Sequence, residues 1–449
     1  MTREKVWSKP GYAAWTFAVL PALLLASCSS SSPSTGKGDS QADSAAVQFD
    51  ASVPAELIVQ ELSGGTEEKF NENYGNMIRK KFPNYTLKFV RWDKGTTLPE
   101  LIAAGQRVDL VLSSVNTLMQ RLTGSEYDVT ELIKKHNVNL SLLEAPVIDG
   151  MRAMFDGKMY AVPITQVKQA MFYNKDLFGR FGVPYPQDGL TWDETAEIAK
   201  KMTRADNGKQ ILGFAASPVH NLSSNQLSKP YLDPKTLKPT FLDKEWQTLY
   251  ETYFLQFARD STYKNRTTAL KRIPYRVEFA GTQEIAMFAF NSQFPFDVTK
   301  EDLANLNWDL TTLPVFAASP RLGSQSLPIT MGMTSMAKNK DAAMAVLKFM
   351  ISEEAQMELS KKGFIPALKS DSVKKLLASE TIYKEKNWAS VFKTDFAALS
   401  YKSIYDSQIQ TYAQDTARDL VTGVIPDLNT AMRQLQEKTE KYIEGEKKK

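Results

Sequence analysis

Cysteine and histidine, the side chains that most often carry nucleophilic or metal-binding chemistry, are scarce in this chain. Its 449 residues include one cysteine, Cys28, and two histidines, His136 and His220, which lie far apart in the sequence. No Cys/His cluster exists, which excludes a structural zinc site. The sequence has no G-x-S-x-G, H-E-x-x-H, G-x-x-x-x-G-K-[ST] or G-x-G-x-x-G motif. The 51 acidic residues leave a carboxylate-pair glycosidase open as a rival, but no motif supports it, so we expect no catalytic residue, metal or cofactor.

The position of Cys28 indicates a different use for its thiol. It follows Leu25-Ala26-Ser27 at the end of the apolar run Ala13–Ala26, which itself follows a basic N-terminus. This is the three-part layout of a secretory signal, and 14 residues are too few to span a bilayer core of about 30 Å. A cleavage site followed by cysteine resembles a bacterial lipobox. The resemblance implies that Cys28 becomes lipid-bearing at the new N-terminus. A stray cysteine after an ordinary signal is the alternative.

The first 50 residues therefore divide into a signal peptide, 1–27, and a lipidated cysteine with a tether, 28–50. The tether is rich in Ser, Gly, Ala and Asp, with almost nothing to bury, so we expect it to be flexible. The remaining chain is long enough for two domains. The formal net charge of +4 includes +2 from the signal, far from the basic surface of a nucleic-acid-binding protein. We expect no nucleic-acid partner.

After the tether, apolar strands alternate with helices. The pattern predicts strands over 55–62, 85–92 and 108–114, with helices over 66–82 and 96–105 between them. Such an order is typical of an α/β fold with a parallel sheet, whose ligands bind at the carboxyl ends of strands. Ser113, Ser114 and Asn116 follow the third strand and are candidate site residues, although Asn116 could instead cap a helix. Trp92 ends the second strand and could face a cleft, a rim or the core.

Four segments, taken in order, resemble the bacterial extracellular solute-binding proteins of ABC importers, in the branch that includes maltodextrin-binding proteins. The segments are Gly157-Lys158-Met159-Tyr160-Ala161-Val162-Pro163, Tyr173-Asn174-Lys175-Asp176-Leu177-Phe178, Gly182-Val183-Pro184 and Thr191-Trp192-Asp193-Glu194. Thr191 and Glu194 also form a helix-capping box, in which Trp192 should be structural. Later matches include Lys338–Ala343 and Gly363–Pro366, while the Lys of the family's Gly-Lys-x-Ala-Met segment is missing before Ala286-Met287.

This resemblance implies two α/β lobes that are joined by crossing strands and close on a solute. We place the crossings near Pro163–Gln166, Leu313–Val315 and Phe364–Pro366. The N-terminal lobe would then comprise 51–165 plus 312–365, and the C-terminal lobe 166–311 plus 366–449. The last segment, 425–445, predicts an amphipathic helix packed on the body.

The resemblance also implies further candidate ligand-binding residues. Gln166 lies on the first proposed crossing. His220 and Asn221 follow the strand 212–217, where family members often place binding residues, although a lone histidine is often structural. Gln293 and Phe294 match a loop that often carries a binding aromatic. Tyr401 could supply another aromatic, although Tyr401 and Tyr405 at helical spacing could also be core.

The implied function is a lipid-anchored receptor that passes a small solute, most simply an oligosaccharide, to an ABC permease. We expect a monomer that is held on the outer face of the cell membrane by its lipid alone. Ser29 after Cys28 favours a Gram-positive type of envelope. A surface sensor or adhesion lipoprotein of the same fold stays open, as do peptide and polyamine ligands.

Overall fold

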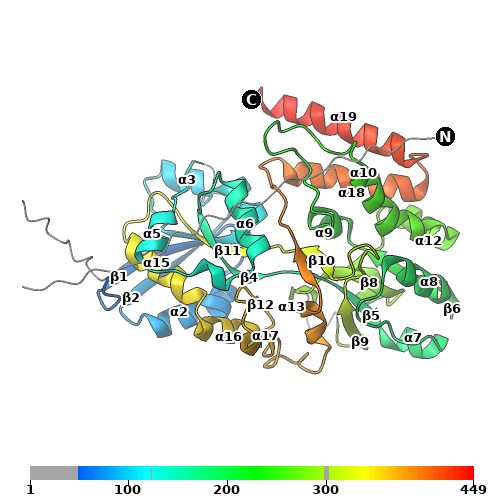
Figure 1. The fold of residues 1–449 in the computed structure, drawn as a ribbon, viewed down its shortest axis with the longest axis horizontal. Coiled ribbons are helices and arrows are strands. Elements are labelled where there is room, and N and C mark those ends of the chain that lie inside the picture. Colours follow the sequence, from blue (N-terminus) through cyan, green and yellow to red (C-terminus); the bar gives the residue numbers. More distant parts are fainter. Residues whose placement is uncertain (1–48, 123, 298–302, 449) are drawn as a thin grey trace, which may run out of the picture. The chain divides into compact units, whose positions relative to one another are not determined.

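The computed structural model describes residues 49–122, 124–297 and 303–448, and residues 49–449 form one compact unit (Figure 1). The expected signal peptide, Cys28 and most of the tether lie outside the described residues. Two separate sheets, each with its own hydrophobic core, organise the unit. No described helix is both long and apolar enough to cross a membrane.

The first sheet has six strands in the order β12-β4-β11-β3-β1-β2. β1 runs parallel to both β2 and β3, with Val59 opposite Leu110, whereas β11 is antiparallel to β3 and β4. The predicted parallel arrangement is thus confirmed for the first three strands. The strands are β1 (Ala55–Glu61), β2 (Tyr85–Arg91), β3 (Leu110–Ser114), β4 (Ala161–Gln166), β11 (Ile329–Met333) and β12 (Ile365–Pro366).

Helices lie on both sides of this sheet in Figure 1. The predicted helix over 66–82 is present as α1, η1 and α2 in succession, and its apolar side, including Phe70 and Ile78, is buried in the first core. The helices are α1 (Glu67–Phe70), η1 (Asn71–Gly75), α2 (Asn76–Lys81), α3 (Leu98–Ala103), α4 (Val115–Arg121), α5 (Thr130–Lys135), η2 (Leu140–Leu142), α6 (Ala145–Met154), α15 (Lys340–Met350), α16 (Glu353–Lys361) and α17 (Asp371–Lys374).

The second sheet has five strands in the order β6-β7-β8-β5-β9. β5 is antiparallel to β8 and β9, and β7 is parallel to β8. A separate pair, β10 with β13, lies outside both sheets. The strands are β5 (Gln169–Asn174), β6 (Arg204–Asp206), β7 (Lys209–Ala216), β8 (Ile285–Asn291), β9 (Trp308–Thr312), β10 (Leu322–Gln325) and β13 (Asp395–Ala397).

The helices of this half confirm two sequence predictions. Thr191 caps α8, where Thr191 N–H donates to Glu194 Oε2 at 2.8 Å, and Trp192 is buried with its indole N–H donating to Gln226. The predicted terminal helix is α19, which packs beside α18 (Figure 1). The helices are α7 (Lys175–Phe181), α8 (Trp192–Met202), α9 (Pro218–Ser223), α10 (Lys244–Tyr250), η3 (Glu251–Leu255), α11 (Gln256–Ala258), α12 (Ser261–Leu270), η4 (Val277–Gly281), α13 (Phe294–Asp297), η5 (Trp388–Phe392), α18 (Asp406–Thr422) and α19 (Leu428–Glu446).

The chain passes between the two sheets on segments that hydrogen-bond to one another. Val167 and Leu327 exchange backbone hydrogen bonds of 3.1 and 2.9 Å, and Ile365 of β12 pairs opposite Gln166 of β4. The segment Leu313–Val315, where the sequence placed the second crossing, instead hydrogen-bonds to the residues that open α8. We therefore propose that this crossing lies near Leu327. The lobe boundaries otherwise remain predictions.

Candidate ligand-binding cleft

A pocket of about 320 Å3 lies between elements of the two sheets. Its first wall includes Glu61 and Ser113, at the ends of β1 and β3, and its second includes Gln293 and Asp297 of the segment after β8. The volume falls within the range of roughly 300–1,000 Å3 that is typical of small-molecule sites. Because β1 and β3 are parallel, their carboxyl ends meet at one sheet edge, which places these polar side chains together.

Three aromatic side chains line this pocket, which we call the aromatic compartment. The ring centroids of Tyr74 and Phe364 are 5.9 Å apart, and those of Phe70 and Tyr74 are 6.3 Å apart. Phe70 and Tyr74 are buried in the first core, while Phe364 is only partly buried. Burial holds the pKa of Tyr74 well above its usual value, so its phenol stays protonated and can donate a hydrogen bond.

A second pocket of about 240 Å3 adjoins the first, because Ser114 and Leu327 line both. Its walls come from α4, which packs in the first core, and from α9 and α18, which pack in the second core. We call the part of the protein around each core a half. We call it the polar compartment, and we call the two compartments together the cleft. Its lining side chains are mostly amides, hydroxyls and a carboxylate: Ser114, Asn116, Thr117, Gln120, His220, Ser223, Asp406, Ser407 and Gln410, with Val219, Tyr231 and Leu327 beside them.

Several buried polar atoms of the cleft lack a protein partner. Ser113 Oγ in the aromatic compartment, and Asn116 Oδ1 and the Tyr231 hydroxyl in the polar compartment, accept or donate no hydrogen bond within the described chain. Leaving a buried polar group unpaired costs about 1–3 kcal/mol, so native proteins rarely do so without a reason. These atoms are suited to a ligand that carries hydroxyl groups.

His220 presents a fixed hydrogen-bonding pattern to the polar compartment. Its Nδ1 lies 2.7 Å from Ser217 Oγ and 3.5 Å from the Tyr275 hydroxyl, and its ring meets Phe290 edge-on at 4.6 Å. Burial, and secondarily Arg276, lower the pKa of His220 to about 4, so the imidazole is neutral at physiological pH. Ser217 Oγ also accepts from the His220 backbone N–H. A neutral imidazole carries one N–H donor and one nitrogen acceptor.

A larger pocket, of about 640 Å3, lies elsewhere, on the surface formed by α8, α11 and α12. All its lining residues belong to the second half, so movement between the halves would not enclose a ligand there. We call it the α8 groove. Among the described residues no group of three or more His, Cys, Asp or Glu side chains could hold a metal ion.

Comparison with known proteins decides the family. A family model described as bacterial extracellular solute-binding protein matches residues 62–357. The chain belongs to this family. A binding protein from Brucella abortus is 24% identical over 345 residues, which cover 70% of this chain and 76% of the relative.

Solved structures share the fold of this solute-binding protein. A sugar transporter from Rhizobium etli in an open conformation superposes with a TM-score of 0.69 at 19% identity, covering 86% of this chain and 99% of that one. An ABC substrate-binding protein from Listeria monocytogenes in complex with cycloalternan gives 0.65 at 20% identity, with 87% and 99% covered. A cyclic maltosyl-maltose-binding protein from Arthrobacter globiformis gives 0.64 at 14% identity, with 86% and 98% covered. The predicted two-lobed α/β fold is confirmed, and the family consists of binding proteins rather than enzymes.

Five of the residues predicted from the sequence line the cleft of this solute-binding protein: Ser113, Ser114, Asn116, His220 and Gln293. Ser114 and Asn116 lie on the first wall, with Ser114 Oγ capping α4 by accepting from Thr117 N–H at 3.3 Å. His220 and Gln293 lie on the second wall, where the Gln293 side chain donates to the Gly363 carbonyl at 3.1 Å. Their contact with a ligand remains a prediction.

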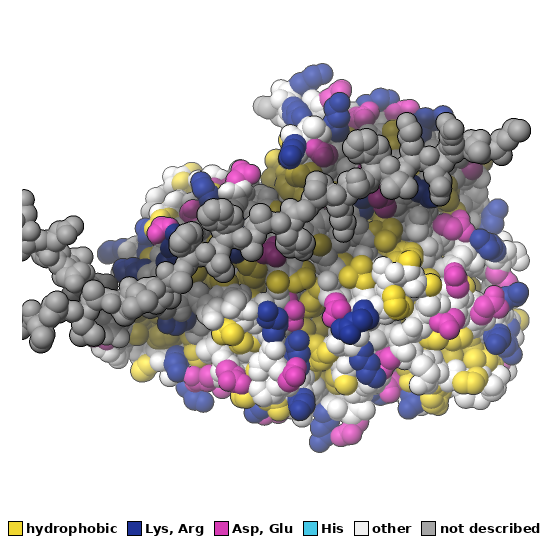
Figure 2. Space-filling model, viewed as in Figure 1, with side chains coloured by type: hydrophobic (Ala, Val, Ile, Leu, Met, Phe, Trp, Pro, Cys, Tyr) yellow, Lys and Arg dark blue, Asp and Glu magenta, His cyan; other side chains and the backbone are white. Residues whose placement is uncertain are grey.

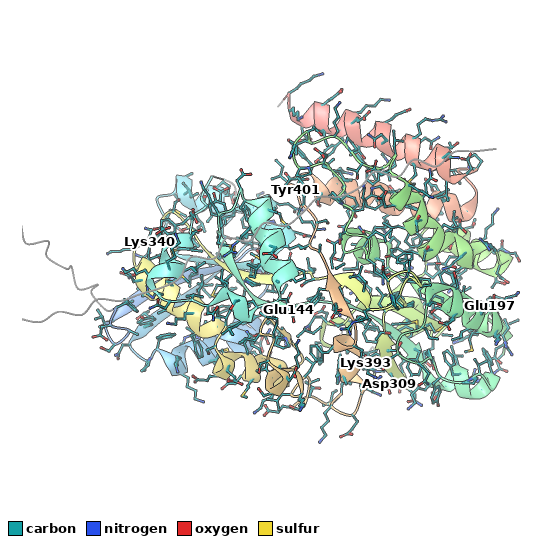
Figure 3. All side chains as sticks on the ribbon, viewed as in Figure 1. Glu144, Glu197, Asp309, Lys340, Lys393 and Tyr401 are labelled. Atoms are coloured by element: carbon teal, nitrogen blue, oxygen red, sulfur yellow. The ribbon has the colours of Figure 1, made fainter. Side chains whose placement is uncertain are left out.

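The other predicted residues do not line either compartment. The Arg121 guanidinium lies over the Trp92 ring, 4.6 Å from the ring centroid. Phe294 is buried in the second core, and the Asn221 amide donates to the carbonyls of Ser217 and Ala289. Gln166 is buried at the crossing, where it accepts from the Ser326 hydroxyl. Tyr401 packs against the first core, on the segment before α18 (Figure 3). These positions favour structural roles.

Sequence reasoning missed several residues that line the cleft. Glu61 ends β1 just as Ser114 ends β3, so the rule that found Ser114 could have found Glu61 as well. Tyr74 lies within the predicted helix over 66–82, and no sequence signal distinguishes it from the residues that only fill the core. Asp297, Tyr231 and Asp406 come from segments without a motif, and no sequence signal marked them.

Proposed function

We propose that this protein is the lipid-anchored receptor of an ABC importer and closes its two lobes on a saccharide, most simply an oligosaccharide. The observation that carries the proposal is the composition of the cleft. The partly exposed ring of Phe364 and the buried rings of Phe70 and Tyr74 line the same compartment as the buried, unpaired hydroxyl of Ser113. Aromatic faces suit the C–H surfaces of a sugar, and the unpaired atoms suit its hydroxyl groups.

The mechanism follows from the placement of the cleft between the two halves. A solute that touches Ser113 or Asn116 on one wall and His220 or Gln293 on the other makes all these contacts only when the walls are close. Such a ligand binds the closed state better and shifts the population toward it. The crossing segments near Val167 and Leu327 would act as the hinge, and a membrane permease would recognise the closed form.

Three of the fold relatives support the choice of ligand class, since they are named for a sugar, for cycloalternan and for a cyclic maltosyl-maltose. The surface lends no support to a nucleic-acid partner. Figure 2 shows Lys and Arg side chains interspersed with Asp and Glu on the face in view, without a basic stripe.

A thermal-shift screen of residues 49–449 tests the ligand class. The panel would contain maltotriose, cellotriose, mannotriose, a tripeptide and spermidine. A ligand that binds only the folded state at a hundredfold excess over its dissociation constant stabilises it by about 2.7 kcal/mol. A shift with a saccharide supports the proposal. A shift with only the peptide or spermidine would overturn the saccharide assignment.

The anchor requires its own experiment, because it depends on Cys28. Cells expressing the full chain would be labelled with a radioactive fatty acid. We expect label in the wild-type protein and none in Cys28→Ala. Equal labelling of the two proteins would contradict lipidation at Cys28.

A further inference from the structure

Two carboxylates face the aromatic compartment from opposite walls. Glu61 ends β1 in the first half, and Asp297 ends α13 in the second. The Glu61 carboxylate is held in place by the loop that follows it: Oε1 accepts from Ser63 N–H at 2.9 Å and Oε2 accepts from Gly65 N–H. Its orientation toward the compartment is therefore fixed before any ligand binds.

Among the residues that the structure describes, neither carboxylate is paired with a cation of its own. Within the described residues no Lys or Arg forms an ion pair with Glu61 or Asp297, and Lys69, the lysine that lines the compartment, pairs with Glu72 at 2.8 Å. Arg276 acts on Asp297 only from a distance. Although Asp297 is exposed toward the cleft, surrounding protein atoms desolvate its carboxylate and raise its pKa to about 6, against the smaller opposing effect of Arg276.

Both negative charges converge on one group. After burial, the charges of Glu61 and Asp297 contribute to the raised pKa of Tyr74, so its hydroxyl lies within electrostatic reach of both carboxylates. Closing the lobes would bring the two like charges nearer to each other in a site that is losing water, which is unfavourable unless a cation enters between them. Ser113 lines the same compartment. Its side chain is only 2% exposed, and its Oγ has no hydrogen-bond partner within the described chain. This unpaired hydroxyl indicates a polar ligand there.

We propose that the aromatic compartment selects a saccharide bearing a protonated amino group, whose ammonium bridges Glu61 and Asp297 when the lobes close. The inference rests on the proposed saccharide-binding function and narrows it to amino sugars. The ammonium neutralises the repulsion that closure creates, through charge-assisted hydrogen bonds to both carboxylates. The adjacent rings of Tyr74 and Phe364 accept the apolar face of the same sugar, and their π faces also attract a cation.

Isothermal titration calorimetry on residues 49–449 tests this selection with matched ligands. Cellotriose, the glucosamine trisaccharide of chitosan and its triacetylated form share one backbone and differ in charge, and glucose with glucosamine gives a second pair. We expect the amino sugar of a pair to bind at least about tenfold more tightly than its neutral counterparts. The preference should shrink as salt is added, because the interaction is partly exposed.

Isosteric variants locate the effect. Glu61→Gln and Asp297→Asn should each remove most of the preference for the amino sugar, measured as the ratio of the amino-sugar and neutral-sugar affinities of the same variant. The matched control is Glu197→Gln, since Glu197 lies on α8 away from the cleft (Figure 3) and should leave the preference unchanged. Melting curves would establish that each variant is folded.

The outcomes separate this inference from the function on which it rests. Equal binding of amino and neutral sugars would overturn the charge selection and leave the saccharide receptor intact. An amino preference that survives both Glu61→Gln and Asp297→Asn would also overturn it. Silence with every saccharide, or binding of spermidine alone, would overturn the proposed function itself.

Discussion

The two compartments of the cleft share Ser114 and Leu327 but offer different chemistry to a ligand. The aromatic compartment presents ring faces from Tyr74 and Phe364 beside two carboxylates. The polar compartment presents a neutral imidazole, amides and hydroxyls, with Tyr231 as the one tyrosine or phenylalanine among its described lining residues. If a sugar binds as proposed, we expect ring contacts to supply most of the affinity and directional hydrogen bonds to set the orientation of the sugar.

The compartments also differ in how they are built. The first wall of the aromatic compartment combines the ends of β1, β3 and β11, which their hydrogen bonds hold in register, with the loop after β1 and the helical segments α1 and η1. The polar compartment is bounded by helices, and the short helix α9 is fixed at its start by Ser217, whose hydroxyl also contacts His220. A change in the aromatic compartment should therefore affect binding strength, whereas a change in the polar compartment should affect ligand choice as well.

The largest effect is expected from Phe364→Ala. Removing a partly exposed ring from the centre of a site typically costs about 2 kcal/mol, or roughly 30-fold in affinity. Calorimetry with the saccharide found by screening would measure the loss, and Phe364→Tyr, which keeps an aromatic face, should bind nearly as well as wild type. Full affinity in Phe364→Ala would show that the aromatic compartment does not hold the sugar ring.

A smaller effect is expected from His220→Ala. Loss of one neutral hydrogen bond to the ligand costs about 1 kcal/mol, or roughly fivefold in affinity. His220→Gln retains an N–H donor and should recover part of the loss, which a purely structural role would not explain. If the loss were the same for every sugar of the panel, His220 would not contribute to ligand choice.

Even in the absence of ligand, the pH dependence of the free energy of unfolding should show that His220 is buried as a neutral imidazole. Its pKa falls from 6.5 to about 4 on folding, so between these values the unfolded chain binds more protons than the folded one. This group therefore lowers the free energy of unfolding as pH drops from about 6.5 toward 4. Asp297 acts with the opposite sign, because its pKa is raised to about 6.

Urea unfolding of wild type and His220→Gln over this pH range isolates the histidine. We expect the stability difference between the two proteins to change with pH in favour of the variant as the solution becomes more acidic. A difference that does not vary with pH would mean that His220 titrates normally in the folded protein.

The smallest effect is expected in the α8 groove. Glu197→Gln should leave saccharide affinity within about twofold of wild type, as is usual for an exposed charge far from a site. The α8 groove is larger than either compartment of the cleft, but only residues of the second half line it. A strong loss of binding in this variant would move the site from the cleft to the groove.

The sequence predicted the first wall better than the second. Ser113, Ser114 and Asn116 follow a strand of a parallel sheet, so a general rule about strand ends placed them at the site. On the second wall, Gln293 and Phe294 are adjacent, but Gln293 lines the cleft and Phe294 lies in the core. No local pattern distinguishes the two, because the direction of each side chain depends on how α13 packs against β8 and β5.

The crossings show the same limit. The segment Leu313–Val315 reads as a short extended connection, but in the structure it hydrogen-bonds to the start of α8, and we propose that the second crossing follows β10, near Leu327. β10 pairs with β13, some 70 residues later in the chain. Local periodicity cannot predict a pairing between segments so far apart in the sequence. Asp406 reaches the cleft by a similar long-range route, through the packing of α18 beside α9.

Small-angle X-ray scattering of residues 49–449, with and without a saturating amount of the saccharide found by screening, would show whether the two lobes close on the solute. We expect a smaller radius of gyration with ligand, because a sugar that bridges the two walls of the cleft favours the closed state. Phe364→Ala should reduce this change at the same ligand concentration. Tight binding with an unchanged radius of gyration would contradict closure of the two lobes on the solute.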